Sequence, residues 1–263
     1  MRLSQWLRRT MLGSVSGPRA ALFVLAVLGL AAVPVAKAAA ADDDMAIALS
    51  LAEMLRASRA IISAEQSLID DPQLGDKGLT GQVVLDRAIV QFRQATGIDP
   101  AALDPASRQG RLLRAMMTSI AEVVDANQPT INTKGTGFKG FIPSTFGRLV
   151  DEAFARAAKG EAEVKVTAPA ELIRNRRARP DAWEAEIIRT KLLTPGWPRG
   201  QAFSDLVRVS DRDAFRVMVP EYYAASCLSC HGEPKGEMDK TGYPKEGSKV
   251  DDLGGVISIT LYR

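Results

Sequence analysis

Two cysteines and one histidine stand within five residues near the end of the chain, in the pentad Cys227-Leu228-Ser229-Cys230-His231. Two thiols on one turn of chain can reach the two vinyl groups of a haem and form thioether bonds, and a histidine directly after them can bind the iron as the proximal ligand. These are the only cysteines and the only histidine of the 263 residues. The pentad therefore predicts one covalent c-type haem held by Cys227, Cys230 and His231. We expect the second ring nitrogen of His231 to donate to a backbone carbonyl.

Other uses of a Cys-x-x-Cys pair explain the pentad less completely. A structural disulfide between Cys227 and Cys230 suits an oxidising compartment, but its small loop would add little stability and leaves His231 without a role. A thioredoxin-type pair opens a helix after an early strand, whereas this pair lies in the last 40 residues. A zinc site would need a fourth ligand from a carboxylate. A nucleophilic triad would need the one histidine that the haem already uses.

The N-terminal segment indicates export. Arg2, Arg8 and Arg9 precede an uncharged apolar run over residues 20–36, and further alanines follow it. These three parts are typical of a secretory signal peptide. We expect residues 1–41 to be cleaved and the mature chain to be periplasmic. The run lies at the short limit for a spanning helix, so the alternative is a retained anchor, the one case in which we expect membrane contact.

The charge of the mature chain excludes a nucleic-acid partner. The whole chain has 34 basic and 31 acidic residues, but its first 41 residues hold five basic residues and no acid. The rest therefore carries about −2. Binding to a nucleic-acid backbone needs a concentrated positive face, and nothing in this balance provides one.

The elements that must position the pentad change in type along the chain. Apolar spacing predicts helices after an Asp42-Asp43-Asp44 cap, around Val83, after Ser107 and from Pro143, and a short helix after Pro180. Alternating polarity predicts strands over residues 163–167, 206–209, 214–219 and 256–262. Helices followed by strands indicate an α+β fold with an antiparallel sheet.

Several motifs around the pentad resemble those of a known family. They are Gly137-Phe138-Lys139-Gly140-Phe141-Ile142-Pro143, Arg174-Asn175 through Glu184, Tyr222-Tyr223 through Gly232-Glu233-Pro234, Tyr243-Pro244-Lys245-Glu246-Gly247, and Leu253-Gly254-Gly255-Val256-Ile257-Ser258. With them the mature chain resembles the periplasmic c-type haem family with a PAS-like fold. Members of that family occur as free proteins and as input domains of sensor kinases and chemoreceptors.

This resemblance implies N-terminal helices packed on a PAS-like antiparallel sheet, with one haem lodged between them. We accordingly divide the chain into a signal peptide (1–41), a helical N-terminal region (42–135) and a PAS-like haem c domain (136–263). Some relatives use a further cysteine as the distal ligand, and this sequence has no third cysteine. No kinase or receptor segment follows the last predicted strand, so we expect a free periplasmic protein.

The surroundings of the haem have several candidates. The sixth iron position can be filled by methionine, by a less usual donor such as lysine or tyrosine, or by water, or it can be open. Among the methionines the Met116-Met117 pair, taken as Met117, is favoured. Arg174 is expected to bind the propionates, because buried carboxylates need a cationic partner. Tyr223 is expected to pack on the macrocycle. The other candidates for these last two roles are Arg177, Arg179, Lys139, Tyr222, Phe138, Phe141 and Trp183.

The expected function is that of a sensor module that responds to redox state or to a small ligand and passes its state to a periplasmic partner protein. The alternative is a periplasmic electron-transfer cytochrome. We expect no enzyme, because a peroxidase needs distal acid–base groups and no second histidine is present to serve as one.

Overall fold

Helix α1 (Ala32–Ala64) is the first element of the described chain. The computed structural model describes the backbone of residues 32–263 and the side chains of residues 41–263, so most of the predicted signal peptide lies outside the described residues. Residues 41–263 group into one compact unit. No helix in the described part is long and apolar enough to cross a membrane.

The start of α1 differs from the prediction. The helix already runs through residues 42–44, where an N-terminal cap was expected. The buried carboxylate of Asp44 instead binds two guanidinium groups, with 2.9 Å from Oδ1 to Nη1 of Arg108 and 2.6 Å from Oδ2 to Nη2 of Arg263. The alanines before Asp44 favour a helix that continues through this point, and the carboxylate forms its charge-assisted bonds with the two arginines. The predicted cap is therefore wrong.

The other predicted helices of this half are confirmed. The helical elements after α1 are α2 (Gln66–Ile69), α3 (Gly81–Thr96), η1 (Pro100–Ala102), α4 (Arg108–Ala126), α5 (Gln128–Ile131) and α6 (Pro143–Ala157). The Thr80 side chain caps α3 by accepting from the backbone N–H of Val83, and Ser107 caps α4 in the same way. Gly97 follows the last residue of α3, and its φ of 71° is a left-handed conformation that glycine adopts without strain.

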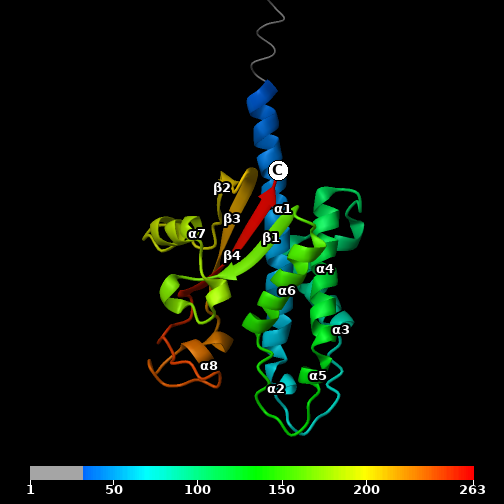
Figure 1. Cartoon of the computed structure of the whole chain (residues 1–263), viewed down its shortest axis with the longest axis vertical. Coiled ribbons are helices and arrows are strands. Elements are labelled where there is room, and N and C mark those ends of the chain that lie inside the picture. Colours follow the sequence, from blue (N-terminus) through cyan, green and yellow to red (C-terminus); the bar gives the residue numbers. More distant parts are fainter. Residues whose placement is uncertain (1–31) are drawn as a thin grey trace, which may run out of the picture. The chain divides into compact units, whose positions relative to one another are not determined.

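Four strands form one antiparallel sheet, as predicted (Figure 1). They are β1 (Ala162–Thr167), β2 (Phe203–Val209), β3 (Arg212–Tyr222) and β4 (Leu253–Tyr262). Their order is β1-β4-β3-β2, so β4 lies between β1 and the β2–β3 hairpin. The hairpin turn is shorter than expected, because only Ser210 and Asp211 separate its strands and Ser210 takes a φ of 53°.

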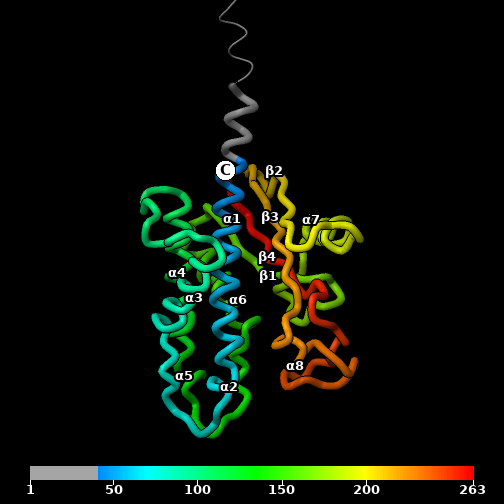
Figure 2. Tube along the Cα trace, turned by 180° about the vertical axis from the view of Figure 1, so that it is seen from behind, coloured from blue at the N-terminus to red at the C-terminus, as the bar shows by residue number. Residues whose placement is uncertain are grey.

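Both faces of the sheet are covered. The main hydrophobic core joins Ile257, Ile259 and Leu261 of β4 to buried residues of α1, α3, α4 and α6. Helices α3 and α4 lie on one side of α1, and β2 and β3 lie on the other (Figures 1 and 2). On the second face of the sheet, Met218 and Val256 pack against α7 (Ala182–Ile187) and the π-helical turn η4 (Ile188–Leu192). The polar positions of β4 are therefore buried as well.

A carboxyl group is buried where α6 meets the sheet. Oδ2 of Asp151 accepts a hydrogen bond from the backbone N–H of Val166 at 3.0 Å. Its Oδ1 is buried and has no hydrogen-bond partner among the described residues. Burial raises the pKa of Asp151 to about 7, although the Val166 hydrogen bond and the charge of Arg59 act in the opposite direction. The folded chain therefore holds this proton at a pH at which an ordinary carboxyl group has lost it.

The buried carboxyl predicts a pH-dependent stability. The unfolded carboxyl has a pKa of 3.8 and the folded one a pKa of about 7, so the contribution is complete below the first value and is lost as pH rises through the second. We expect the free energy of unfolding to fall between pH 4 and 7, by up to about 4 kcal/mol at about 1.4 kcal/mol per pKa unit. An Asp151→Asn variant keeps an acceptor for Val166 and should lack this slope.

The slope is measured by urea denaturation at several pH values. The control is Asp86→Asn, which removes an exposed carboxyl from α3 and should leave the slope in place. Parallel pH profiles for the Asp151→Asn variant and the unchanged protein would show that this carboxyl is ionised in the folded chain.

Candidate haem site

The pentad forms a short helical segment directly after the sheet. The 3₁₀ turn η5 (Ala225–Cys227) continues into α8 (Leu228–His231), so both cysteines and the histidine lie on about one turn. Both thiols are free and partly exposed. At Gly232 a Cβ atom would lie 2.7 Å from the carbonyl oxygen of Leu228, so only glycine lets the chain leave α8 along this path.

His231 is oriented by a carboxylate. Its Nδ1 lies 2.9 Å from Oε2 of Glu246 and 3.3 Å from the hydroxyl of Tyr223. The predicted backbone carbonyl partner is therefore wrong, because the loop that follows the pentad brings a charged, stronger acceptor to this nitrogen. With the proton on Nδ1, the lone pair of Nε2 is left to bind a metal. Nε2 makes no hydrogen bond to any residue of the described chain.

Arg174 joins the pentad to the loop that carries Glu246. Its Nε donates to Oε1 of Glu246 at 2.8 Å and its Nη2 donates to Oε2 at 3.0 Å. The same Nη2 donates to the carbonyl oxygen of Cys230 at 2.8 Å, and Nη1 donates to Oδ2 of Asp239 at 2.6 Å. The guanidinium group thus has three protein partners, and a contact between Arg174 and a haem propionate stays a prediction.

The two acids of this cluster are held in the charged form. Burial opposes the ionisation of Glu246, but its hydrogen bonds to Arg174 and His231 outweigh burial and lower its pKa. Asp239 has a fully buried side chain. Burial again acts against its charge, and hydrogen bonds from Thr241, Arg174 and Tyr243 hold its pKa well below the usual range.

The ring of Tyr223 covers one face of the His231 imidazole. The ring centroids are 4.9 Å apart and the planes meet at 26°. Burial and the nearby charge of Glu246 raise the pKa of Tyr223 to about 12, so its hydroxyl keeps its proton at neutral pH. A Cβ atom at Gly254 would lie 2.5 Å from Cε1 of this ring. The Tyr223 ring therefore occupies space that is free only because Gly254 has no side chain.

One family model matches this chain. It is described as Tll0287-like (Tll0287) and matches residues 94–261, which is 168 of the 263 residues and includes the pentad. The chain belongs to the Tll0287-like family. The match supports a cytochrome c-like domain. No curated protein and no solved structure matches the chain.

The donor set of this Tll0287-like protein fits a covalently attached haem. The thiols of Cys227 and Cys230 are unbonded and partly exposed, and Nε2 of His231 has its lone pair available. These three side chains would hold the group, which when bound supplies one-electron exchange and a binding position at iron. No group of three or more His, Cys, Asp or Glu side chains among residues 41–263 is arranged to hold a metal ion without such a cofactor.

Other predicted neighbours of the haem lie apart from the pentad in this Tll0287-like protein. Met117 is on α4, where it packs partly buried against the main helical core. Its role as iron ligand stays a prediction. Lys139 donates to the carbonyl oxygens of Ile69 and Asp71, and Arg177 pairs with Glu152.

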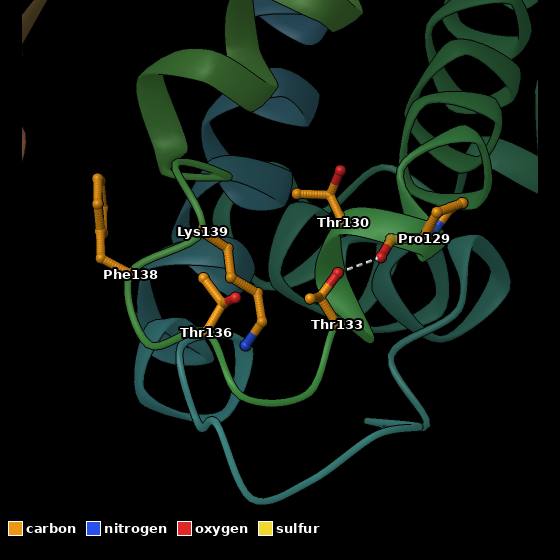
Figure 3. Close-up of a pocket in the computed structure, with 6 residues that line it drawn as sticks. All are labelled: Pro129, Thr130, Thr133, Thr136, Phe138 and Lys139. Carbon is orange, nitrogen blue, oxygen red and sulfur yellow. Dashed lines mark hydrogen bonds between the residues drawn. The ribbon is translucent and has the colours of Figure 1, made fainter.

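The loop after the pentad reaches the helical half of the chain. Nζ of Lys240 lies 3.0 Å from Oδ2 of Asp70 and 5.2 Å from the centroid of the Phe138 ring. Phe138 and Lys139 also line a cavity of about 320 Å³ beside α5, together with Pro129 and three threonines (Figure 3). Phe138 is therefore linked to the loop that carries Glu246.

Sequence reasoning missed Glu246 and Asp239 as partners in the site. Glu246 stands in the Tyr243 to Gly247 motif that carries the family resemblance, which was a signal without an assigned role. Asp239 carried no signal, because it lies in a polar loop and is buried only in the folded chain.

Proposed function

We propose that this Tll0287-like protein is an exported c-type haem protein with one haem, which acts as a sensor module for redox state or a small ligand. The observation that carries the proposal is the pentad itself: two free thiols and the only histidine, whose Nδ1 is held by Glu246 at 2.9 Å. We also propose that the sheet and its helices form a PAS-like domain, that the mature chain is periplasmic, and that it is no enzyme.

The links between the pentad and the rest of the chain favour a sensor. Arg174 joins the carbonyl of Cys230 to Glu246 and Asp239, and the next residue, Lys240, contacts the α2 end at Asp70. A change at His231 can therefore shift a loop that touches both halves of the chain. Such a loop suits a protein that passes its state to a periplasmic signalling partner.

Electron transfer is the second candidate, because the pentad is only partly buried. The side chain of His231 is 27% exposed, and Cys227 and Cys230 are also partly exposed. A haem attached there would keep an edge near the surface, where a periplasmic redox partner can dock.

Covalent attachment is tested on protein exported together with the haem-attachment machinery. We expect the mature chain to gain the mass of one haem and to show the absorption bands of a c-type cytochrome in the reduced form. A variant with Cys227→Ala and Cys230→Ala should gain no mass. A mature chain without the added mass would overturn the proposal.

The two candidate functions give different spectra. A sensor should bind carbon monoxide or nitric oxide in the ferrous form, or exchange a ligand on reduction. An electron-transfer protein should have a low-spin spectrum in both oxidation states and should bind neither gas. If neither gas changes the spectrum and reduction causes no ligand exchange, the sensor function is contradicted and electron transfer is the remaining candidate.

A further inference from the structure

We infer that Glu246 tunes the iron site through His231. Its negatively charged carboxylate, placed next to Nδ1, makes Nε2 a stronger ligand and lowers the reduction potential of the haem. Arg174 is the positioning residue that holds this carboxylate in place. The inference rests on the proposed function, because it requires a haem at His231.

The geometry puts the charge at the ligand itself. Oε2 of Glu246 lies 2.9 Å from Nδ1 of His231, within the range of a charge-assisted hydrogen bond. The side chain of Glu246 is 18% exposed, so water screens this contact only in part. A carboxylate that accepts a hydrogen bond from the Nδ1–H group raises the basicity of a ligating histidine. A more basic ligand stabilises the oxidised iron more than the reduced iron.

The surrounding cluster keeps a net negative charge beside His231. Arg174 binds both oxygens of Glu246 in a bidentate arrangement and also binds Asp239, whose side chain is fully buried. Two carboxylates and one guanidinium group leave one negative charge in excess. Asp239 thus offsets the charge of Arg174, so the guanidinium group fixes Glu246 without cancelling its effect on His231.

The hydroxyl of Tyr223 does not account for the contact. It lies 3.3 Å from Nδ1, further away than the carboxylate, and it is neutral. Tyr223 contributes its ring, which covers one face of the imidazole. A Tyr223→Phe variant removes the hydroxyl and retains the ring.

The test is a redox titration of the haem-loaded Glu246→Gln variant. Glutamine has the shape of glutamate and lacks the charge. At a fixed ambient potential we expect the ratio of reduced to oxidised protein to rise at least tenfold, which is a positive shift of about 59 mV for one electron. The control Glu237→Gln should change the ratio less than threefold, and Tyr223→Phe, which removes a neutral neighbour of Nδ1, should change it less than Glu246→Gln does. Glu237 is an exposed carboxylate of the same loop that pairs with Lys245.

The outcomes separate the inference from the function on which it rests. A protein that carries no haem contradicts the proposed function. A haem-loaded Glu246→Gln variant with an unchanged potential, or a Glu237→Gln variant with an equal shift, overturns the inference. If Glu246→Gln does not fold, NMR spectroscopy of the unchanged reduced protein labelled with ¹⁵N-histidine tests the inference instead. The chain has one histidine, so every labelled signal comes from His231. We expect a strongly deshielded Nδ1 proton that exchanges slowly, and a fast-exchanging one overturns the inference.

Discussion

In a His231→Gly variant we expect the spectrum of a histidine-bound iron to disappear while the mass added at Cys227 and Cys230 remains. The thioether bonds depend on the two thiols alone, whereas the proximal bond depends on the imidazole. The chain has no second histidine that could replace it. Mass analysis and absorption spectroscopy of the same sample measure the two bonds separately.

Added imidazole should restore much of the lost spectrum. The glycine leaves the space that the His231 side chain filled, and the carboxylate of Glu246 that held Nδ1 at 2.9 Å remains in the loop to orient a free imidazole. The matched control is Ser229→Ala, an exposed position inside the pentad, which should leave the spectrum unchanged. A His231→Gly protein with the spectrum of the unchanged protein would show that another residue binds the iron.

A single methyl group at Gly254 should disrupt the site by displacing the Tyr223 ring. The Cβ atom of a Gly254→Ala variant would lie 2.5 to 2.7 Å from three atoms of the Tyr223 ring, closer than van der Waals contact allows. Overpacking of this kind costs about 1–3 kcal/mol. The ring is stacked on His231, so we expect both a lower free energy of unfolding and a shifted haem spectrum.

A double-mutant cycle identifies the cause of that loss. Combining Gly254→Ala with Tyr223→Ala removes the ring that the new methyl group meets, so the two effects should not add. Gly137→Ala is the control, because its Cβ would have only one neighbour within 4 Å, at 3.9 Å. Additive losses in the cycle would mean that the clash lies elsewhere.

The sequence predicts the elements best where the signal is local. Ser107 caps α4 by accepting from the backbone N–H three positions later, as the sequence predicts. Thr80 caps α3 in the same way, although only the helix and not its cap was predicted. Asp44 failed as a cap because its partners Arg108 and Arg263 stand 64 and 219 residues away. The sequence also does not show that the polar positions of β4 are buried, since α7 and η4 pack on this face of the sheet from a distant part of the chain.

The site divides in the same way. The spacing of the pentad is local and was predicted, and Arg174 and Tyr223 were predicted as neighbours because a haem needs a cation for its propionates and apolar packing for its ring. The structure gives Arg174 partners that could not be inferred, because Glu246 and Asp239 lie 72 and 65 residues from it. The partner of Nδ1 depends on how the chain between His231 and Glu246, which stands 15 positions later, folds back, and neither composition nor periodicity determines that path.

The position of β4 has a consequence for biogenesis. Strand β4 lies between β1 and β3 in the sheet, yet it follows the pentad in the chain. A polypeptide that emerges amino end first therefore displays both thiols before the strand that unites its sheet has appeared. Glu246 and Gly254 also emerge after the thiols. On the proposed function, an enzyme that attaches haem would meet the two thiols while the domain is still incomplete, and β4 would complete the sheet afterwards.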